Sequence, residues 1–150
     1  MTGTVFSHIM PGNGALSAQP EARRQSVPVP KRPQQARPAK VLHAIDAASS
    51  PATPVTDLAQ LTSAATRAVG AGQGHVLGTS HVVFPNGAIT LVLILAESHL
   101  SIHTWPEEDL VAVDLFSCGA IDADRVISEL ARLLRLDRVT VRAVPRGLPG

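Results

Sequence analysis

Residues 85–105 read PNGAITLVLILAESHLSIHTW, and this stretch decides the fold. The PNG segment at 85–87 is a strong hairpin-turn signal. The apolar run at 89–96 is typical of a central, buried strand. From Leu100 onward apolar and polar residues alternate, which predicts a half-buried strand with one polar face. Together these features indicate an antiparallel sheet.

A first helix is predicted upstream of this stretch. Thr53 suits the N-cap and Pro54 the first helical position, and apolar residues then recur at helical spacing until Gly70. The glycine-rich stretch at 70–74 is expected to form a flexible turn.

A second helix is predicted downstream, with Asp122 or Asp124 as its N-cap. Arg125 and Glu129 have the i,i+4 spacing of an ion pair on its outer face. Its apolar residues form one stripe, made of Val126, Ile127, Leu130, Leu133 and Leu134.

Further strands are predicted on both sides of the opening stretch, at 41–45, 75–84, 110–116 and 139–144. The resulting element order is β-α-β-β-β-β-α-β, and no internal repeat is present. This order predicts a two-layer α+β sandwich, in which helices pack on one face of an antiparallel β-sheet.

Charge is divided unevenly along the chain. The whole chain has 13 basic and 12 acidic residues, for a net charge of +1. Residues 1–40 contain six basic residues, one acidic residue and six prolines, whereas residues 41–150 contain seven arginines and eleven acidic residues. We therefore predict a disordered, basic, Pro-rich tail at 1–40 and one folded domain at 41–150. The charges of the tail are widely spaced and lack interleaved aromatics, so we expect no nucleic-acid partner.

Composition excludes several functional classes. Residues 41–150 contain no lysine, which a pyridoxal phosphate enzyme needs for its Schiff base and a P-loop needs to bind phosphate. Cys118 is the single cysteine, which excludes an intrachain disulfide framework and a cysteine-only metal site. No apolar run is long enough to span a membrane and no signal peptide is visible, so we expect a cytoplasmic protein with no membrane partner.

Titratable and nucleophilic side chains concentrate at 97–107, directly after the most apolar strand. A metal site could use His99, His103 and Cys118, but the H-x-x-x-H spacing suits a helix and this stretch is predicted to be a strand. A Ser/His hydrolase could pair a serine with His103, but the G-x-S-x-G elbow is absent. These side chains could also be polar residues of a half-exposed strand without a chemical role.

The segment LAESHLSIHTWPE at 95–107, followed by Cys118-Gly119, resembles the processing and active-site signature of the bacterial and archaeal S-adenosylmethionine decarboxylases. A weaker similarity in element order extends from about residue 40 to Arg146-Gly147. That family is pyruvoyl-dependent. The tail at 1–40 lies outside the resemblance.

The resemblance implies that the chain cuts itself between Glu97 and Ser98. The Ser98 Oγ would attack the preceding carbonyl carbon and convert the amide into an ester. His103 would then accept the Cα proton, assisted by Ser101, and elimination and hydrolysis would leave a pyruvoyl group at position 98. The cut would yield two chains, β at 1–97 and α at 98–150.

The resemblance also implies roles in decarboxylation. The pyruvoyl group made from Ser98 would form a Schiff base with the substrate amine and accept electrons as CO₂ leaves, which replaces pyridoxal phosphate. Cys118 would return a proton to the substrate carbon, and no metal is expected. Phe84 would stack on adenine, Glu107 would lie near the ribose hydroxyls, and Thr90 would lie near the processing site.

The resemblance further implies a homodimer of αβ units that converts S-adenosylmethionine to decarboxylated S-adenosylmethionine, the aminopropyl donor of spermidine biosynthesis. Trp105 is interpreted as a packing residue. Two alternatives remain. The same chemistry could act on ornithine or arginine, because the extra acids Glu108 and Asp109 would suit a basic substrate if they face the pocket. The chain could also be a non-catalytic relative that binds a small molecule or a partner subunit, although the retained cleavage residues argue against this.

Overall fold

The computed structural model describes residues 39–148. Its elements follow the predicted order, with an additional 3-10 turn, η1, before the fifth strand. Their bounds are β1 Lys40–Ala48, α1 Leu58–Ala71, β2 Val76–Val83, β3 Ile89–Leu95, β4 Ser98–Trp105, η1 Pro106–Glu108, β5 Leu110–Ser117, α2 Ala123–Leu134 and β6 Asp137–Arg146. The tail predicted at 1–40 lies outside the described residues, except for residue 39 and for Lys40, which is the first residue of β1 and so belongs to the folded domain.

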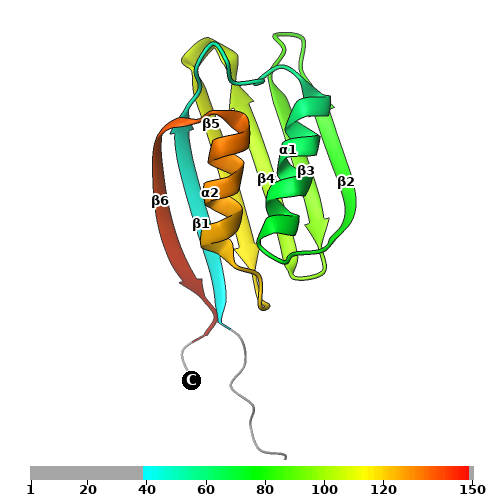
Figure 1. The fold of residues 1–150 in the computed structure, drawn as a ribbon, viewed down its shortest axis with the longest axis vertical. Coiled ribbons are helices and arrows are strands. Elements are labelled where there is room, and N and C mark those ends of the chain that lie inside the picture. The colour runs from blue at the N-terminus through cyan, green and yellow to red at the C-terminus, as the bar shows by residue number, and fades with distance from the viewer. Residues whose placement is uncertain (1–38, 149–150) are drawn as a thin grey trace, which may run out of the picture. The chain divides into compact units, whose positions relative to one another are not determined.

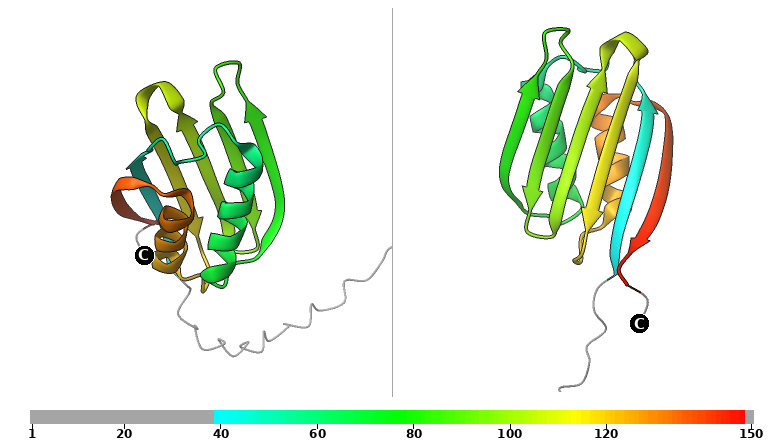
Figure 2. Two further views of the ribbon diagram at one scale, coloured as in Figure 1. Left: turned by 45° about the horizontal axis from the view of Figure 1, so that its top comes forward. Right: turned by 180° about the vertical axis from the view of Figure 1, so that it is seen from behind.

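The six strands form one antiparallel sheet in the order β2-β3-β4-β5-β1-β6. Figure 1 shows α1 and α2 on the same face of this sheet. In the view from behind in Figure 2, the opposite face carries no helix. The predicted two-layer α+β sandwich is therefore confirmed.

The core lies between the two helices and the sheet. Apolar residues at helical spacing on α1 and α2 meet every second residue of the central strands, as the two periodicities predict. Fully buried members include Leu61, Ala65 and Ala68 of α1, Val126 and Leu134 of α2, and Leu91, Leu93, Leu100, Ile102 and Leu115 of the sheet. Neither helix of the described chain is long and apolar enough to cross a membrane.

Strand β3 is apolar throughout, but the helices cover one of its faces only. Leu91 and Leu93 are fully buried beneath the helices, whereas Val92 is half-buried and Ile94 is 52% exposed on the opposite face. The prediction of a central, buried strand is therefore confirmed for the face beneath the helices and wrong for the other face, because the sheet has a helical layer on one side only. The uncovered face keeps apolar side chains exposed.

Helix α1 begins at Leu58 rather than near Thr53. Its N-cap is Asp57, whose carboxylate accepts a hydrogen bond from the Gln60 N–H at 3.0 Å. Thr53 instead donates its hydroxyl hydrogen to the carbonyl oxygen of Arg135, at 3.1 Å, in the segment after α2. The oxygen that would accept a helical N–H in an N-cap instead accepts a hydrogen bond from the Ser50 N–H at 2.8 Å.

Helix α2 is capped by Asp122, not by Asp124. The Asp122 carboxylate accepts a hydrogen bond from the Arg125 N–H at 3.0 Å. The predicted pair of Arg125 with Glu129 is wrong, because Arg132 donates two hydrogen bonds to the Glu129 carboxylate at 2.9 and 2.7 Å. The predicted apolar stripe is confirmed, with Val126, Leu130 and Leu134 buried and Ile127 and Leu133 packed against the core.

The glycine-rich segment after α1 is closely packed, which corrects the prediction of a flexible turn. Gly70 lies within α1, and Gly72 follows it as the C-cap. The Gly72 carbonyl oxygen accepts a hydrogen bond from the Asp122 N–H at 2.9 Å, and a Cβ on Gly72 would lie 2.6 Å from the Asp122 carbonyl oxygen. Gly74 is enclosed in a similar way. This packing fixes the position at which the chain enters His75.

Two neighbouring glycines provide a matched test of this packing. Gly72→Ala should lower the free energy of unfolding by about 1–3 kcal/mol, because the added methyl group meets Asp122 and Val126. Gly70→Ala should raise it by up to about 1 kcal/mol, because a Cβ at this helical position meets nothing within 4 Å. Chemical denaturation in a Ser98→Ala background, where a single chain unfolds, measures both changes. Equal changes in the two variants would contradict the packing.

Candidate active site

The bond predicted to be cut lies in a two-residue turn between β3 and β4. Leu95 pairs with Ser98, so Ala96 and Glu97 form the tip of the hairpin. On its other side Ser98 pairs with Ser117, the last residue of β5. The turn therefore lies at the end of the sheet where strands β3 and β5 finish and strand β4 begins (Figure 1).

The Glu97 carbonyl oxygen accepts two hydrogen bonds from Cys118. The Cys118 backbone nitrogen lies 3.0 Å from this oxygen, and the Cys118 Sγ lies 3.1 Å from it. Two donors directed at one carbonyl oxygen make the carbonyl carbon more electrophilic and stabilise negative charge on the oxygen. The arrangement can therefore assist the attack of a nucleophile on the Glu97 carbonyl carbon.

The backbone of Ser98 is strained. Its φ is 150°, in a region that residues other than glycine rarely occupy. Such a conformation costs about 1–3 kcal/mol and persists only where the surrounding structure enforces it. Here Ser98 is held between Leu95 on β3 and Ser117 on β5. The strain is therefore located at the peptide predicted to be cut.

The Glu97 side chain is held from two sides. Its Oε2 accepts a hydrogen bond from the His75 backbone N–H at 3.1 Å, and its Oε1 lies 2.9 Å from the His75 Nδ1. The ring hydrogen bond, followed by the backbone one, lowers the pKa of the Glu97 carboxyl below its usual value. On the other side, a Cβ on Gly119 would lie 3.1 Å from the Glu97 Cγ. In the sequence, His75 stands only at the start of a predicted strand, and nothing there indicates a contact with Glu97.

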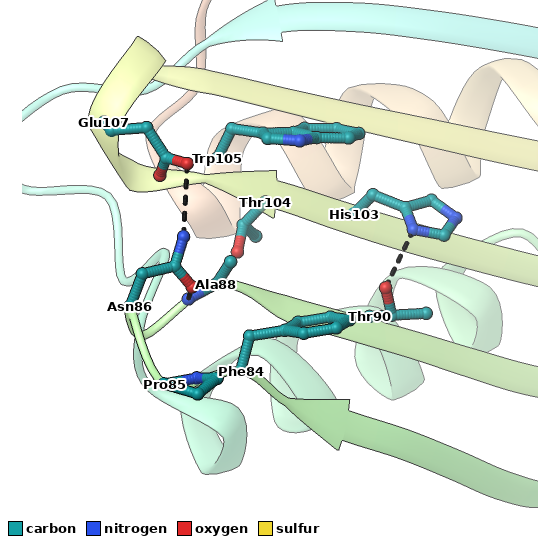
Figure 3. Close-up of a pocket in the computed structure, with 9 residues that line it drawn as sticks. All are labelled: Phe84, Pro85, Asn86, Ala88, Thr90, His103, Thr104, Trp105 and Glu107. Atoms are coloured by element: carbon teal, nitrogen blue, oxygen red, sulfur yellow. Dashed lines mark hydrogen bonds between the residues drawn. The ribbon is translucent and has the colours of Figure 1, made fainter.

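A second group of predicted residues lines a pocket at the opposite end of β4. Phe84, Thr90, His103 and Glu107 are among the residues that line it (Figure 3), and its volume is about 440 Å³. Thr90 and His103 are directly opposite each other on β3 and β4, and the Thr90 Oγ1 lies 3.0 Å from the His103 Nδ1. The pocket thus combines an aromatic ring, an imidazole and a carboxylate.

The other residues that line this pocket had no predicted role in it, and two of them contact predicted residues. Asn86 belongs to the predicted turn, and its Nδ2 donates a hydrogen bond to the Glu107 Oε1 at 3.1 Å (Figure 3). Trp105, interpreted as a packing residue, lines the pocket with its ring centroid 6.0 Å from that of His103. The position of Trp105 two residues after His103 on the same strand could have indicated that they share a face.

Within one chain the two groups are far apart. His103 follows Ser98 by five residues in β4, which places it about 16 Å away along the strand. Ser101 is buried between them. The structure therefore brings Glu97, Ser98 and Cys118 together, and leaves His103 in the pocket at the other end of the strand.

The metal alternative required His99, His103 and Cys118 to meet. The His99 ring lies against Phe116, with 5.8 Å between ring centroids, while the Cys118 thiol contacts the Glu97 carbonyl oxygen. Within residues 39–148, no three His, Cys, Asp or Glu side chains are grouped so that they could hold a metal ion.

Comparison with known proteins identifies one family. Its model, described as S-adenosylmethionine decarboxylase, matches residues 42–147. An S-adenosylmethionine decarboxylase proenzyme of Methanococcus vannielii is 43% identical over 70 residues, which cover 46% of this chain and 57% of the relative. An S-adenosylmethionine decarboxylase proenzyme 2 of Bacillus cereus is 35% identical over 75 residues, which cover 49% of this chain and 61% of the relative. The crystal structure of the adenosylmethionine decarboxylase from Aquifex aeolicus matches with a TM-score of 0.62 and 27% identity, and the match covers 77% of this chain and 96% of that chain.

These matches differ in extent. The chain spans about three fifths of the length of the two curated relatives. The structural match, by contrast, includes nearly the whole of the solved chain. Because the family model covers almost all of the described domain, the chain belongs to the S-adenosylmethionine decarboxylase family.

Proposed function

We propose that this protein is a self-processing, pyruvoyl-dependent decarboxylase that converts S-adenosylmethionine to decarboxylated S-adenosylmethionine for spermidine biosynthesis. The observation that carries the proposal is the pair of hydrogen bonds from Cys118 to the Glu97 carbonyl oxygen. Membership of the family supports it, as do the names of two relatives, which are proenzymes.

In the proposed cleavage, the Ser98 Oγ attacks the Glu97 carbonyl carbon. The two Cys118 donors stabilise the negative charge that develops on the carbonyl oxygen. The C–N bond between Glu97 and Ser98 then breaks, and Glu97 is left as an ester on the Ser98 oxygen. Because the positive φ of Ser98 is a property of the intact peptide, this rearrangement can release its strain.

A base then removes the Ser98 Cα proton. The ester C–O bond at the Ser98 Cβ breaks by β-elimination, and Glu97 leaves with a free main-chain carboxylate. Addition of water and loss of ammonia produce the pyruvoyl group, whose carbonyl supplies the electron-accepting centre for decarboxylation. The cut releases Cys118 from the intact carbonyl. Its thiol lies beside position 98, where it can donate a proton to the substrate carbon.

We propose that His103 reaches Ser98 from a second copy of the chain. Direct proton transfer needs a contact of about 3 Å, whereas the two residues are about 16 Å apart along one strand. His103 lies on the uncovered face of the sheet, together with the apolar residues Val92 and Ile94. A second copy packed on this face would bury those apolar side chains. In a two-fold dimer, each chain would then supply the pocket that completes the cleavage turn of the other.

The pocket in Figure 3 suits the adenosyl end of the substrate. The Phe84 ring can stack on an adenine base, and the Glu107 carboxylate can accept hydrogen bonds from ribose hydroxyls. Asn86 donates to Glu107 and so restricts its orientation. Thr90 holds the His103 ring through its hydroxyl.

The acids that suggested a basic substrate lie elsewhere. Glu108 and Asp109 line a separate hollow with Asp46 and Arg138. Among the described residues, Glu107 is the one carboxylate that lines the pocket of Figure 3. This arrangement favours S-adenosylmethionine over ornithine and arginine as the substrate.

Intact mass of the purified protein tests the cleavage. We expect two fragments divided between Glu97 and Ser98 in the wild type, and a single uncut chain in Ser98→Ala. Cys118→Ala should slow cleavage on the order of 100-fold, because it removes one of the two donors to the carbonyl oxygen. Cys118→Ser keeps a donor and should cleave faster than Cys118→Ala. A wild-type preparation that stays full length would contradict the proposed function.

Mixed dimers test the contribution of the second copy. Neither Ser98→Ala nor His103→Ala should be cleaved when produced alone. When the two variants are produced together with different tags, the His103→Ala chain should be cut, because its partner supplies an intact His103. If neither chain is cut in the mixture, His103 does not act across the dimer.

The substrate is tested by release of CO₂ from carboxyl-labelled S-adenosylmethionine, ornithine and arginine. We expect release from S-adenosylmethionine alone. Phe84→Ala should cleave normally but show a raised KM, since it removes a stacking surface from the pocket. Release from ornithine or arginine would assign the chemistry to a basic amino acid, and a cleaved protein without release from any of the three would favour a non-catalytic relative.

A further inference from the structure

The turn at Ala96 and Glu97 is hydrogen-bonded to a residue outside the β3–β4 hairpin. His75, immediately before β2, makes three hydrogen bonds to it. The His75 carbonyl oxygen accepts from the Ala96 N–H at 2.9 Å, the His75 N–H donates to the Glu97 Oε2 at 3.1 Å, and the His75 Nδ1 lies 2.9 Å from the Glu97 Oε1. Both the backbone and the side chain of the turn are therefore fixed by one residue.

The direction of the ring hydrogen bond follows from the partner. An ionised carboxylate can only accept, so the His75 Nδ1 carries the hydrogen. The Glu97 side chain is 15% exposed, whereas that of His75 is 74% exposed. The imidazole thus lies over the carboxylate from the solvent side and leaves Glu97 little freedom to turn outward.

Gly119 closes the opposite side of the Glu97 side chain. A Cβ at this position would lie 3.1 Å from the Glu97 Cγ and 3.4 Å from its Cβ, so the glycine lets the β5–α2 segment approach the turn closely. The same segment begins with Cys118, which donates to the Glu97 carbonyl oxygen. The side chain of Glu97 is consequently confined between His75 and the segment that supplies both donors.

We propose that His75 is a positioning residue for self-cleavage: by holding the Glu97 carboxylate, it keeps the Glu97 carbonyl oxygen directed at the Cys118 donors. This inference rests on the proposed cleavage between Glu97 and Ser98. His75 contacts neither the Ser98 hydroxyl nor the scissile carbonyl among the hydrogen bonds of the described chain. Its effect is therefore on geometry, and a misplacement of about 1 Å in a reacting group can cost about 100-fold in rate.

Three variants separate this role from a general effect on the fold. His75→Ala removes the ring donor and keeps the backbone hydrogen bonds. His75→Asn places an amide nitrogen on Cγ, where Nδ1 is attached in histidine, and can restore the donor. His81→Ala is the matched control, because His81 is an exposed histidine of β2 that makes no contact with the turn in the described chain.

The rate of chain cleavage is measured on freshly produced, full-length protein by gel and intact mass. We expect cleavage to be slowed about tenfold to 100-fold in His75→Ala, largely recovered in His75→Asn, and unchanged in His81→Ala. Cleavage of His75→Ala at the wild-type rate would overturn the inference. Equal slowing in His75→Ala and His75→Asn would also overturn it, because the loss would then not come from the Nδ1 hydrogen bond.

A second measurement does not depend on cleavage. In the uncut Ser98→Ala chain, NMR titration should give a Glu97 pKa below the usual value, and adding His75→Ala should raise it, because the largest cause of the lowered pKa is the ring hydrogen bond. An unchanged Glu97 pKa would overturn the inference. A wild-type chain that never cleaves is a different result, because it defeats the proposed function itself while leaving the contact between His75 and Glu97 measurable.

Discussion

The two hydrogen bonds from Cys118 to the Glu97 carbonyl oxygen are the contacts on which the candidate site depends. They form because β5 pairs with β4 in a register that sets Ser117 opposite Ser98. Cys118, the next residue, therefore lies beside the turn that ends in Glu97. That register is fixed by buried pairs such as Leu100 opposite Leu115. A slip of β5 by one residue would turn Leu115 to the uncovered face and move Cys118 away from Glu97. Core packing and site geometry are therefore set by the same strand pairing.

The length of β4 separates two of the candidate site residues, Ser98 and His103, within one chain. Its first residue, Ser98, lies at the cleavage turn, whereas His103 lies near its far end beside the pocket. An extended strand cannot bring these two residues together, because it advances about 3.3 Å per residue. The apolar side chains of Val92 and Ile94 on the uncovered face give a separate reason for a second copy. The length of the strand and the exposed apolar side chains thus lead to the same proposed dimer.

The sheet and both helices could be predicted because period-two and helical patterns directly express which face is buried. The start of α1 could not, because the Thr53 oxygen accepts a hydrogen bond from the Ser50 N–H, and Asp57 takes the cap. The candidate site could be predicted as a set of residues because the segment at 95–119 resembles a family signature, which also implied Phe84 and Thr90. That these residues divide into two groups could not be predicted, because the division depends on the register of the strands. The contact of His75 with Glu97 could not be predicted either, because it depends on how the α1–β2 loop packs.

The hairpin turn that would be cut is the single peptide connection between β3 and β4. Cys118 reaches Glu97 only after β5 has paired with β4, so the chain must fold before it can be cut. After the cut, residues 1–97 and 98–150 would be held together by sheet hydrogen bonds and the shared core alone. Unfolding would then release two separate molecules, and their reassociation would depend on concentration. The native state of the cut protein would be preserved by slow unfolding rather than by ready refolding, as in other proteins whose stability is kinetic.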